Sequence, residues 1–239
     1  MLKKAVIVAA GLSSRLYPLT LEEPKCLLEV NRQPILKRTI SILKKNNINE
    51  IFVVIGYQKD RIIDSIGPDI QYIVNPFYQH CNNMGSLWFG KNFVGREPFI
   101  YLHGDVLFHP EIISQAIKHF STSENDMELM TDFGETDEEA MKVRVTEDKF
   151  LLESNKEISS FQSAGEWTGI ACIRSSRTLF EYIEKVMFND GLNFYDTYAF
   201  TNMVKDGYKI QCISTLDYPW IEVDFLSDYE KAKEMFESE

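Results

Sequence analysis

The chain has 239 residues, enough for one α/β domain of ordinary size or two small ones. It carries 25 Lys and Arg against 36 Asp and Glu, so its formal net charge is −11 and its isoelectric point is near 4.9. A surface this acidic repels a phosphodiester backbone, which argues against general nucleic-acid binding, although local cations and a metal can still hold a small phosphorylated ligand.

The cysteine and hydropathy patterns indicate a soluble cytoplasmic protein. Cys26, Cys81, Cys172 and Cys212 are scattered and form no C-x-x-C pair, which argues against a zinc site or a disulfide framework. The apolar run at residues 5–10 is shorter than the ~7–15 residues of a signal-peptide core. No segment approaches the ~18 apolar residues that a membrane span needs, so we expect no membrane contact.

Strand and helix patterns alternate over the first 125 residues. Buried strands are predicted at residues 5–8, 51–55, 71–74 and 99–102. Helices are predicted from Pro34, over residues 84–93 and from Pro110. This alternation predicts an α/β fold with a mostly parallel sheet, in which ligands bind beyond the carboxyl ends of the strands.

After about residue 125 the pattern changes to a series of short predicted strands. They are placed at residues 127–131, 142–146, 150–153, 168–173, 209–214 and 220–223. Helices are predicted around residues 179–186 and over residues 225–236. Because no linker, repeat or low-complexity stretch separates the two parts, we expect one domain over residues 1–239, in which residues 126–239 complete the sheet and cap the site.

The loop after the first strand carries the strongest chemical signal. It consists of Ala9, Ala10, Gly11, Leu12, Ser13 and Ser14, followed by Arg15 and later by Pro24 and Lys25. Small residues let backbone N–H groups converge on phosphate oxygens, and Arg15 and Lys25 add cations that suit a polyphosphate. The alternatives are a tight structural turn, a solvated Lys25, and an Arg15 that pairs with Glu22 or Glu23.

Three carboxylates lie at the ends of predicted strands or just after them. Asp105 comes after Gly104 at the end of the strand at 99–102, so it can share one site with the Gly11 loop although the two are far apart in sequence. Glu222 and Asp224 alternate near the strand at 220–223 and therefore face the same side. A helix cap is the alternative for each aspartate, and a salt bridge is the alternative for Glu222.

Gly11-x-x-x-Arg15 followed by Pro24-Lys25 resembles the signature of the nucleotidyltransferases that couple an NTP to a phosphorylated small molecule, with Ser13 at a position that is often a second glycine. The resemblance covers essentially the whole chain, because residues 82–88, 104–105, 165–170 and 220–224 follow in the expected order. Asn-Asn-x-Gly-Ser-Leu-Trp at 82–88, with residues 202–206, is most similar to the bacterial phosphocholine cytidylyltransferases and their relatives that act on 2-aminoethylphosphonate or other phosphonate and phosphate acceptors.

This resemblance implies a Rossmann-like, mostly parallel mixed sheet flanked by helices, of the GT-A-like type. It implies that residues 1–125 bind the nucleotide, residues 126–239 bind the acceptor, and CMP passes from CTP to the acceptor, most simply phosphocholine, with release of pyrophosphate. Lys25, Arg15 and Asp105 would be catalytic, and Asp105 and Asp224 would hold Mg²⁺, which prefers oxygen ligands. Because the attacking oxygen is already anionic, catalysis would be positioning and electrostatics without a strong general base.

The resemblance also implies which residues contact the base and the acceptor. The nucleotide would lie against the loop residues 9–14, Gly104, Asn83, Gly85 and Ser86, although Asn also caps helices well. An ammonium-bearing acceptor would suit aromatic rings with nearby carboxylates. The candidates are Glu166, Trp167, Tyr195, Asp196, Trp220 and Glu222. Each aromatic residue has a core role as its alternative, and the histidines receive no acid–base role.

Three other functions compete with this interpretation. A sugar-1-phosphate nucleotidylyltransferase would need polar groups for hydroxyls, whereas the Gly165-Glu166-Trp167 segment favours a small charged acceptor. A glycosyltransferase would carry Asp-x-Asp, but Val106 and Leu107 follow Asp105. A non-catalytic nucleotide-binding regulator need not keep the loop cations and the carboxylates together. We expect a monomer or homodimer whose ligands are CTP and a phosphorylated small molecule.

Overall fold

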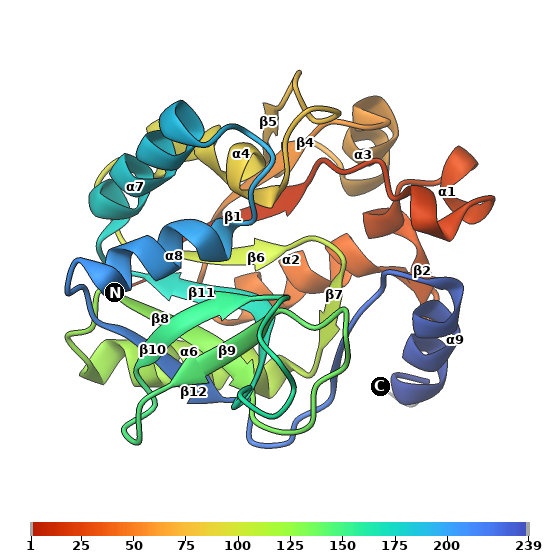
Figure 1. Ribbon diagram of the computed structural model, residues 1–239. Coiled ribbons are helices and arrows are strands. Elements are labelled where there is room, and N and C mark those ends of the chain that lie inside the picture. Colours follow the sequence, from red (N-terminus) through yellow and green to blue (C-terminus); the bar gives the residue numbers. More distant parts are fainter. Residues whose placement is uncertain (1, 238–239) are drawn as a thin grey trace.

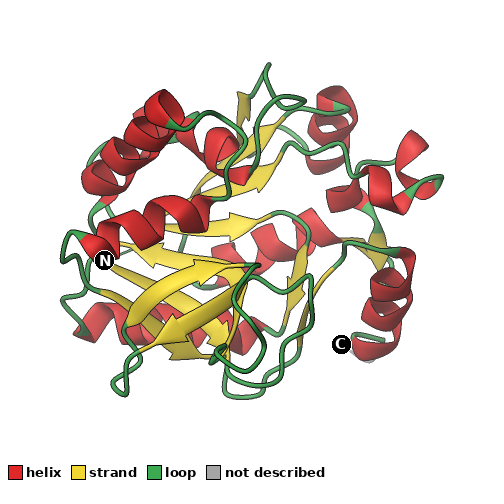
Figure 2. Ribbon diagram, in the orientation of Figure 1, coloured by secondary structure: helices red, strands yellow, loops and turns green. Residues whose placement is uncertain are grey.

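A mixed sheet of nine strands runs through the computed structural model, which describes residues 2–237 (Figure 2). Its strands are β1 (Lys4–Ala9), β4 (Glu50–Ile55), β5 (Gln71–Val74), β6 (Phe99–His103), β8 (Met127–Asp132), β9 (Lys142–Val145), β10 (Leu151–Asn155), β11 (Gly165–Ile173) and β12 (Ile210–Ser214). The main path is β10-β9-β11-β6-β1-β4-β5, and β8 pairs with β11 and β12. Strands β6, β1, β4 and β5 are parallel, as predicted, and β11 joins β6 in antiparallel orientation.

Helices cover both faces of the sheet because its strands bury side chains on both sides (Figure 1). Along β1, Ala5 and Ile7 face one apolar cluster and Val6 and Val8 face the other. The first face is covered by α2 (Ile35–Lys45), α3 (Lys59–Ile66) and α6 (Pro110–Thr122). The second is covered by α4 (Asn83–Trp88), α7 (Ser176–Asn189) and α8 (Asp196–Lys205).

A third apolar cluster joins the end of the chain to the segment after β1. Here β7 (Val106–Phe108) pairs with β13 (Trp220–Glu222), and α9 (Leu226–Met235) follows directly. Ala232 of α9 packs with Leu16, Leu28 and Val223. The short elements η1 (Ser14–Leu16), α1 (Leu19–Glu22), η2 (Lys25–Leu27), β2 (Glu29–Val30) and β3 (Gln33–Pro34) complete this region. This packing holds residues 222–224 beside the loop that follows β1.

The predicted elements and the observed ones differ in a few places. The helix predicted over residues 84–93 is two helices, α4 and α5 (Lys91–Val94), which separate where Gly90 passes β1: a Cβ on Gly90 would lie 3.3 Å from Val6 Cγ1. Helices α3 and α8 and strand β7 were not predicted. None of the helices within residues 2–237 is long and apolar enough to cross a lipid bilayer.

Candidate active site

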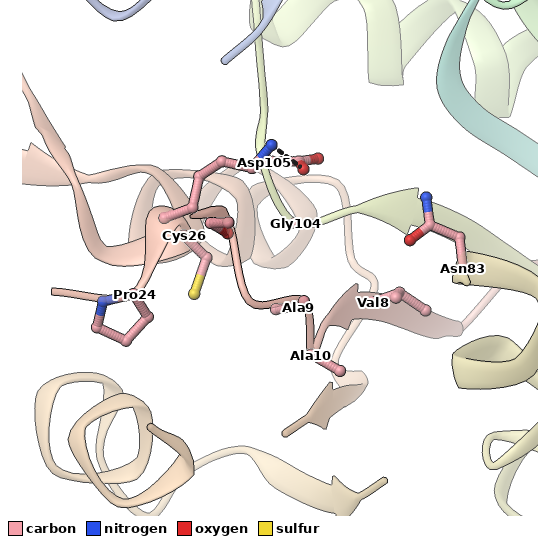
Figure 3. A pocket seen from close by; sticks show the side chains of 11 residues that line it. Val8, Ala9, Ala10, Pro24, Cys26, Asn83, Gly104 and Asp105 are labelled. Carbon is pink, nitrogen blue, oxygen red and sulfur yellow. Dashed lines mark ion pairs between the residues drawn. The ribbon is translucent and has the colours of Figure 1, made fainter. Parts of the chain in front are cut away.

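The end of β1 and the end of β6 meet at the floor of a cleft. The Gly104 amide donates to the carbonyl of Val8 at 2.8 Å, and a Cβ on Gly104 would lie 2.8 Å from Ala9 Cβ. Glycine is therefore required for this close approach, which places Asp105 beside the β1 loop. The floor is lined by Ala9, Ala10, Gly11, Ser13, Lys25, Asn83, Gly104 and Asp105, several of them labelled in Figure 3.

The predicted phosphate loop has one residue in the left-handed region. Ser13, at the position where the resemblance often has glycine, adopts φ 55° and ψ 37°, and its carbonyl accepts a hydrogen bond from the Thr20 hydroxyl at 2.7 Å. Leu12 and Ser14 belong to the same loop but are not among the residues that line the cleft. The loop backbone at residues 9–11 and 13 therefore faces the cleft.

Lys25 joins the two carboxylates that the sequence singled out. Its Nζ lies 2.7 Å from Asp105 Oδ2 and 2.6 Å from Asp224 Oδ1, and its side chain is 12% exposed. Burial alone would lower the pKa of Lys25, but Asp105 and Asp224 raise it above its ordinary value, which favours the charged ammonium. Burial opposes ionisation of Asp224 as well, yet Lys25 and Arg15 hold the pKa of that carboxyl below its usual range.

The carboxylates around Lys25 fit a divalent cation. Asp105 Oδ1 is buried and has no hydrogen-bond partner among the described residues, and carboxylate oxygens are the donors that Mg²⁺ prefers. Ligand atoms of His103, Asp105 and Glu222 also lie within 4.8 Å of one another. Burial lowers the pKa of His103, but the hydrogen bond to Asp196 and the charge of Glu222, 3.8 Å from Nδ1, raise it to about 10, which favours a proton over a metal on this ring. Asp105 and Asp224 offer carboxylate oxygens, so this pair fits a magnesium ion better.

Arg15 lines the cleft and links the loop after β1 to two carboxylates of the second half of the chain. Its guanidinium lies 3.1 Å from Asp224 Oδ2 and 3.3 Å from Glu139 Oε2. Pairing with Glu22 or Glu23, the alternative considered for this residue, is not found among the ion pairs of residues 2–237. Arg15 therefore lies at the site, where it is paired with two carboxylates of the chain.

Lys156 is a cation of the site that the sequence reasoning missed. It follows β10, pairs with Glu139 at 3.1 Å and lies over the Tyr195 ring at 5.6 Å from its centroid. No motif marks it, because it reaches the cleft only through the fold of the second half. With Lys156, five successive ion pairs link six side chains of alternating charge at the cleft. We call this series the charge row: Lys156, Glu139, Arg15, Asp224, Lys25 and Asp105.

The segment expected to contact the base is only partly exposed to the cleft. Asn82 and Asn83 both line the cleft, and the Asn82 side chain also accepts a hydrogen bond from the Asn83 amide, which caps α4. Ser86 is 4% exposed and accepts a hydrogen bond from Asn75 at 3.0 Å. Gly85 is needed for packing, since a Cβ there would lie 2.6 Å from Cys81 Cβ. Ser86 and Gly85 therefore shape the loop at 75–82 instead of facing a ligand.

Asp196, predicted to contact the acceptor, lies behind His103 instead. It is completely buried and accepts hydrogen bonds from the Tyr101 hydroxyl at 2.7 Å and from His103 Nε2 at 3.0 Å. Opposite the ring, a bulge in β11 places Gly169 at φ +76°, and a Cβ there would lie 2.9 Å from His103 Nδ1. A direct contact between Asp196 and a ligand is thus excluded, and its effect on the cleft passes through His103.

The remaining acceptor candidates line two adjoining cavities. Glu166, Trp220 and Glu222 line a cavity of about 280 Å³, and Trp167 and Tyr195, again with Glu222, line one of about 210 Å³. Because neighbours on a strand face opposite sides, Trp167 turns away from Glu166: it is 2% exposed, and its indole N–H donates to the Ile170 carbonyl. The pKa of Glu166 is raised to about 7, chiefly by burial and to a smaller extent by the negative charge of Glu222.

Comparison with known sequences gives one family and several relatives. A sequence profile described as "Nucleotidyl transferase" matches residues 4–162. The CTP:phosphoglutamine cytidylyltransferase of Campylobacter jejuni is 24% identical over 95% of this chain and 97% of its own length. The choline-phosphate cytidylyltransferase of Streptococcus pneumoniae is 38% identical over 37% of this chain and 39% of its own length.

Solved structures share the fold. The inositol-1-phosphate CTP transferase from T. maritima superposes with a TM-score of 0.82 at 21% identity, covering 99% of this chain and 95% of the other. The CTP:phosphocholine cytidylyltransferase from Streptococcus pneumoniae has a TM-score of 0.78 at 21% identity, with 97% and 98% covered. These likenesses confirm the predicted Rossmann-like sheet flanked by helices.

Proposed function

Because this chain belongs to the nucleotidyl transferase family and is an enzyme of that type, we propose that it is a cytidylyltransferase that transfers CMP from CTP to a small phosphorylated acceptor. The observation that carries the proposal is the Lys25 ammonium, held between Asp105 and Asp224 at the end of the small-residue loop. CTP is favoured because relatives named as cytidylyltransferases match this chain.

In the proposed reaction, a phosphate or phosphonate oxygen of the acceptor attacks the α-phosphorus of CTP. The new phosphorus–oxygen bond forms as the bond to the β-phosphate bridging oxygen breaks, and that electron pair leaves with pyrophosphate. The attacking oxygen is anionic at neutral pH, so the site needs cations and no strong base. Arg15 and Lys25 lie where they can bind the triphosphate, and Lys156 lies where it can bind the acceptor phosphate.

The magnesium site belongs to this proposal. Asp105 and Asp224 would hold the ion, and a bound Mg²⁺ would neutralise charge on the transferring phosphates. Asn83, which lines the floor of the cleft beside Gly104, is proposed to contact the nucleotide. Residues 1–125 would thus supply the nucleotide site, and residues 126–239 most of the acceptor site.

The acceptor is proposed to be an amino-alcohol phosphate or an aminoalkylphosphonate. Phosphocholine follows from the sequence resemblance, and 2-aminoethylphosphonate is the alternative. Relatives named for each of these acceptors match parts of the chain, at 38% identity for choline phosphate and 30% for 2-aminoethylphosphonate. The carboxylates Glu166 and Glu222 in the adjoining cavity support an acceptor with a positive group.

The test is pyrophosphate release with Mg²⁺, in which each of the four NTPs is crossed with phosphocholine, 2-aminoethylphosphonate and glucose 1-phosphate. We expect release with CTP and an amine-bearing acceptor. Release with glucose 1-phosphate would assign a sugar-phosphate enzyme instead. Asp105→Ala and Asp224→Ala should each abolish turnover while circular dichroism remains native, and near-full activity in both would refute the metal assignment.

A further inference from the structure

Resting on the proposed function, we infer that the acceptor's head group is an ammonium that carries N–H donors, and that Glu166 and Glu222 bind it in preference to a trimethylammonium. The site for this group is the cavity of about 280 Å³ that adjoins the charge row. It shares Glu139, Glu222 and Asp224 with the neighbouring cavity that Lys156 and Arg15 line. A short acceptor with its phosphate at these cations therefore places its other end among carboxylates.

This cavity has more negative charge than the protein neutralises. Of its twelve lining residues, seven are Asp or Glu and one, Lys231, is basic. Two of the carboxylates belong to the charge row and are paired: Asp224 with Lys25 and Arg15, and Glu139 with Arg15 and Lys156.

Three further carboxylates are satisfied by N–H groups of the chain. Asp137 accepts backbone amides at Glu139 and Ala140. Asp228 accepts the amides of residues 224 and 225 at the start of α9. Asp132 accepts the Trp220 indole N–H at 2.9 Å. These hydrogen bonds hold the three carboxylates in the local structure, so we assign them a structural role and not a ligand-binding one.

Glu166 and Glu222 remain. Within the part of the chain that the structure describes, no Lys or Arg forms an ion pair with Glu166, and the cation nearest to Glu222 is His103, whose Nδ1 is 3.8 Å away. Both side chains line the cavity, one from β11 and the other from β13. Burial and the neighbouring charge of Glu222 raise the pKa of Glu166 to about 7, as expected where positive charge is missing. A bound ammonium would supply that charge.

The aromatic rings near the site favour N–H donors over methyl groups. A trimethylammonium has no N–H and is held by the faces of aromatic rings. The Phe225 ring already faces Arg15 at 5.4 Å, the Tyr195 ring faces Lys156 at 5.6 Å, and Trp167, which lines the neighbouring cavity, is only 2% exposed. Trp220 lines the carboxylate cavity, where its indole N–H donates to Asp132. The chain's own cations thus occupy two of the rings, whereas the two carboxylates present oxygens that an R–NH₃⁺ group can donate to.

The experiment is a methylation series at constant phosphate. Initial rates with CTP are measured for phosphoethanolamine, its N-methyl and N,N-dimethyl derivatives and phosphocholine, with 2-aminoethylphosphonate to compare phosphonate with phosphate and propyl phosphate as the uncharged analogue. We expect kcat/KM to fall along the series by about tenfold or more, with propyl phosphate the poorest. A rise toward phosphocholine would overturn the inference.

Variants separate the carboxylate from general damage to the site. Glu166→Gln should lower kcat/KM for phosphoethanolamine by about tenfold and for phosphocholine by less than about threefold, with the KM for CTP unchanged. Glu147→Gln, in the exposed turn after β9, is the matched control and should change neither. Equal loss for both acceptors in Glu166→Gln would overturn the role of this carboxylate.

Binding of CTP, measured by calorimetry, distinguishes this inference from the proposed function. CTP that binds while no amine-bearing acceptor reacts overturns the head-group assignment and leaves the nucleotide site standing. Absence of CTP binding by the folded wild-type chain refutes the proposed function itself.

Discussion

Replacing Lys25 by Met should make the stability of the chain depend on Mg²⁺. The ammonium lies 2.7 Å from Asp105 and 2.6 Å from Asp224, and these carboxylates are 24% and 27% exposed. Removal of one partner from a fully buried ion pair costs about 3–5 kcal/mol. Because water reaches both carboxylates here, we expect a loss of about 2 kcal/mol. With about 2.1 cal/mol/K per residue over 239 residues, this lowers Tm by about 4 °C.

A divalent cation can replace the missing charge in the variant. If Mg²⁺ binds the two freed carboxylates with a Kd of about 1 mM, then about 10 mM Mg²⁺ restores about 1.4 kcal/mol, or about 3 °C in Tm. In the wild-type chain without nucleotide, Lys25 already neutralises both carboxylates, so Mg²⁺ should raise Tm by less than about 1 °C.

Thermal unfolding with and without Mg²⁺ measures this difference. The matched control is Lys91→Met, which removes a 2.6 Å ion pair with Glu184 elsewhere and should respond to Mg²⁺ as the wild type does. Adding Asp105→Asn to Lys25→Met should abolish the response. An equal Mg²⁺ response in wild type and Lys25→Met would refute the reasoning that lysine and metal compete for the same two carboxylates.

Four further substitutions test other parts of the site. Glu166, with its pKa raised to about 7, keeps a proton that the unfolded chain releases near pH 4.5, so the contribution of Glu166 to stability falls as pH rises between these values. Glu166→Gln should therefore be more stable than the wild type by about 1–2 kcal/mol near pH 8 but not near pH 4, and a pH-independent difference in urea denaturation would contradict this. Asp196→Asn should lower the free energy of unfolding by about 2 kcal/mol and lower the pKa of the His103 ring. An NMR titration that finds this pKa unchanged would contradict the role of Asp196 in keeping the ring charged. Gly169→Ala should lose about 1–3 kcal/mol and most turnover because its Cβ would meet the His103 ring at 2.9 Å, and a stable, active variant would argue against this contact. Lys156→Met should raise the KM of the acceptor about tenfold and that of CTP less than twofold, whereas equal rises would place this lysine elsewhere in the reaction.

The parts of the fold and site that follow from local pattern were predictable. The strand at β1 is a short apolar run bounded by small residues, and the ends of parallel strands meet at one edge, so the neighbourhood of Gly11 and Asp105 followed from the sequence. Helix α8 was not predicted because the side chains it buries include Asp196, Thr197 and Thr201 as well as apolar residues, which hides its amphipathic pattern.

Side-chain direction was the harder part to predict. Glu166 and Trp167 are adjacent in sequence, yet the pleat of β11 sends one to the acceptor cavity and the other into the core. Asp196 has the right chemistry for an acceptor contact but lies behind a histidine ring. Lys156 has no local signal, because only the pairing of β9 and β10 brings it to Glu139. Such positions depend on tertiary packing, which cannot be read from residue type and local spacing alone.

The charge row makes ligand binding in this cleft an ion exchange. Each cation that a phosphate would contact is already bound to a carboxylate of the chain, so a ligand gains only the difference between its own contacts and those it breaks. A single phosphate competes poorly for Arg15 and Lys25 together. A triphosphate that brings a divalent cation can pair with both side-chain cations, while its metal ion pairs with the carboxylates that they leave. We therefore expect the resting cleft to bind a lone phosphate more weakly than a triphosphate with its metal ion, before any base or head group is recognised.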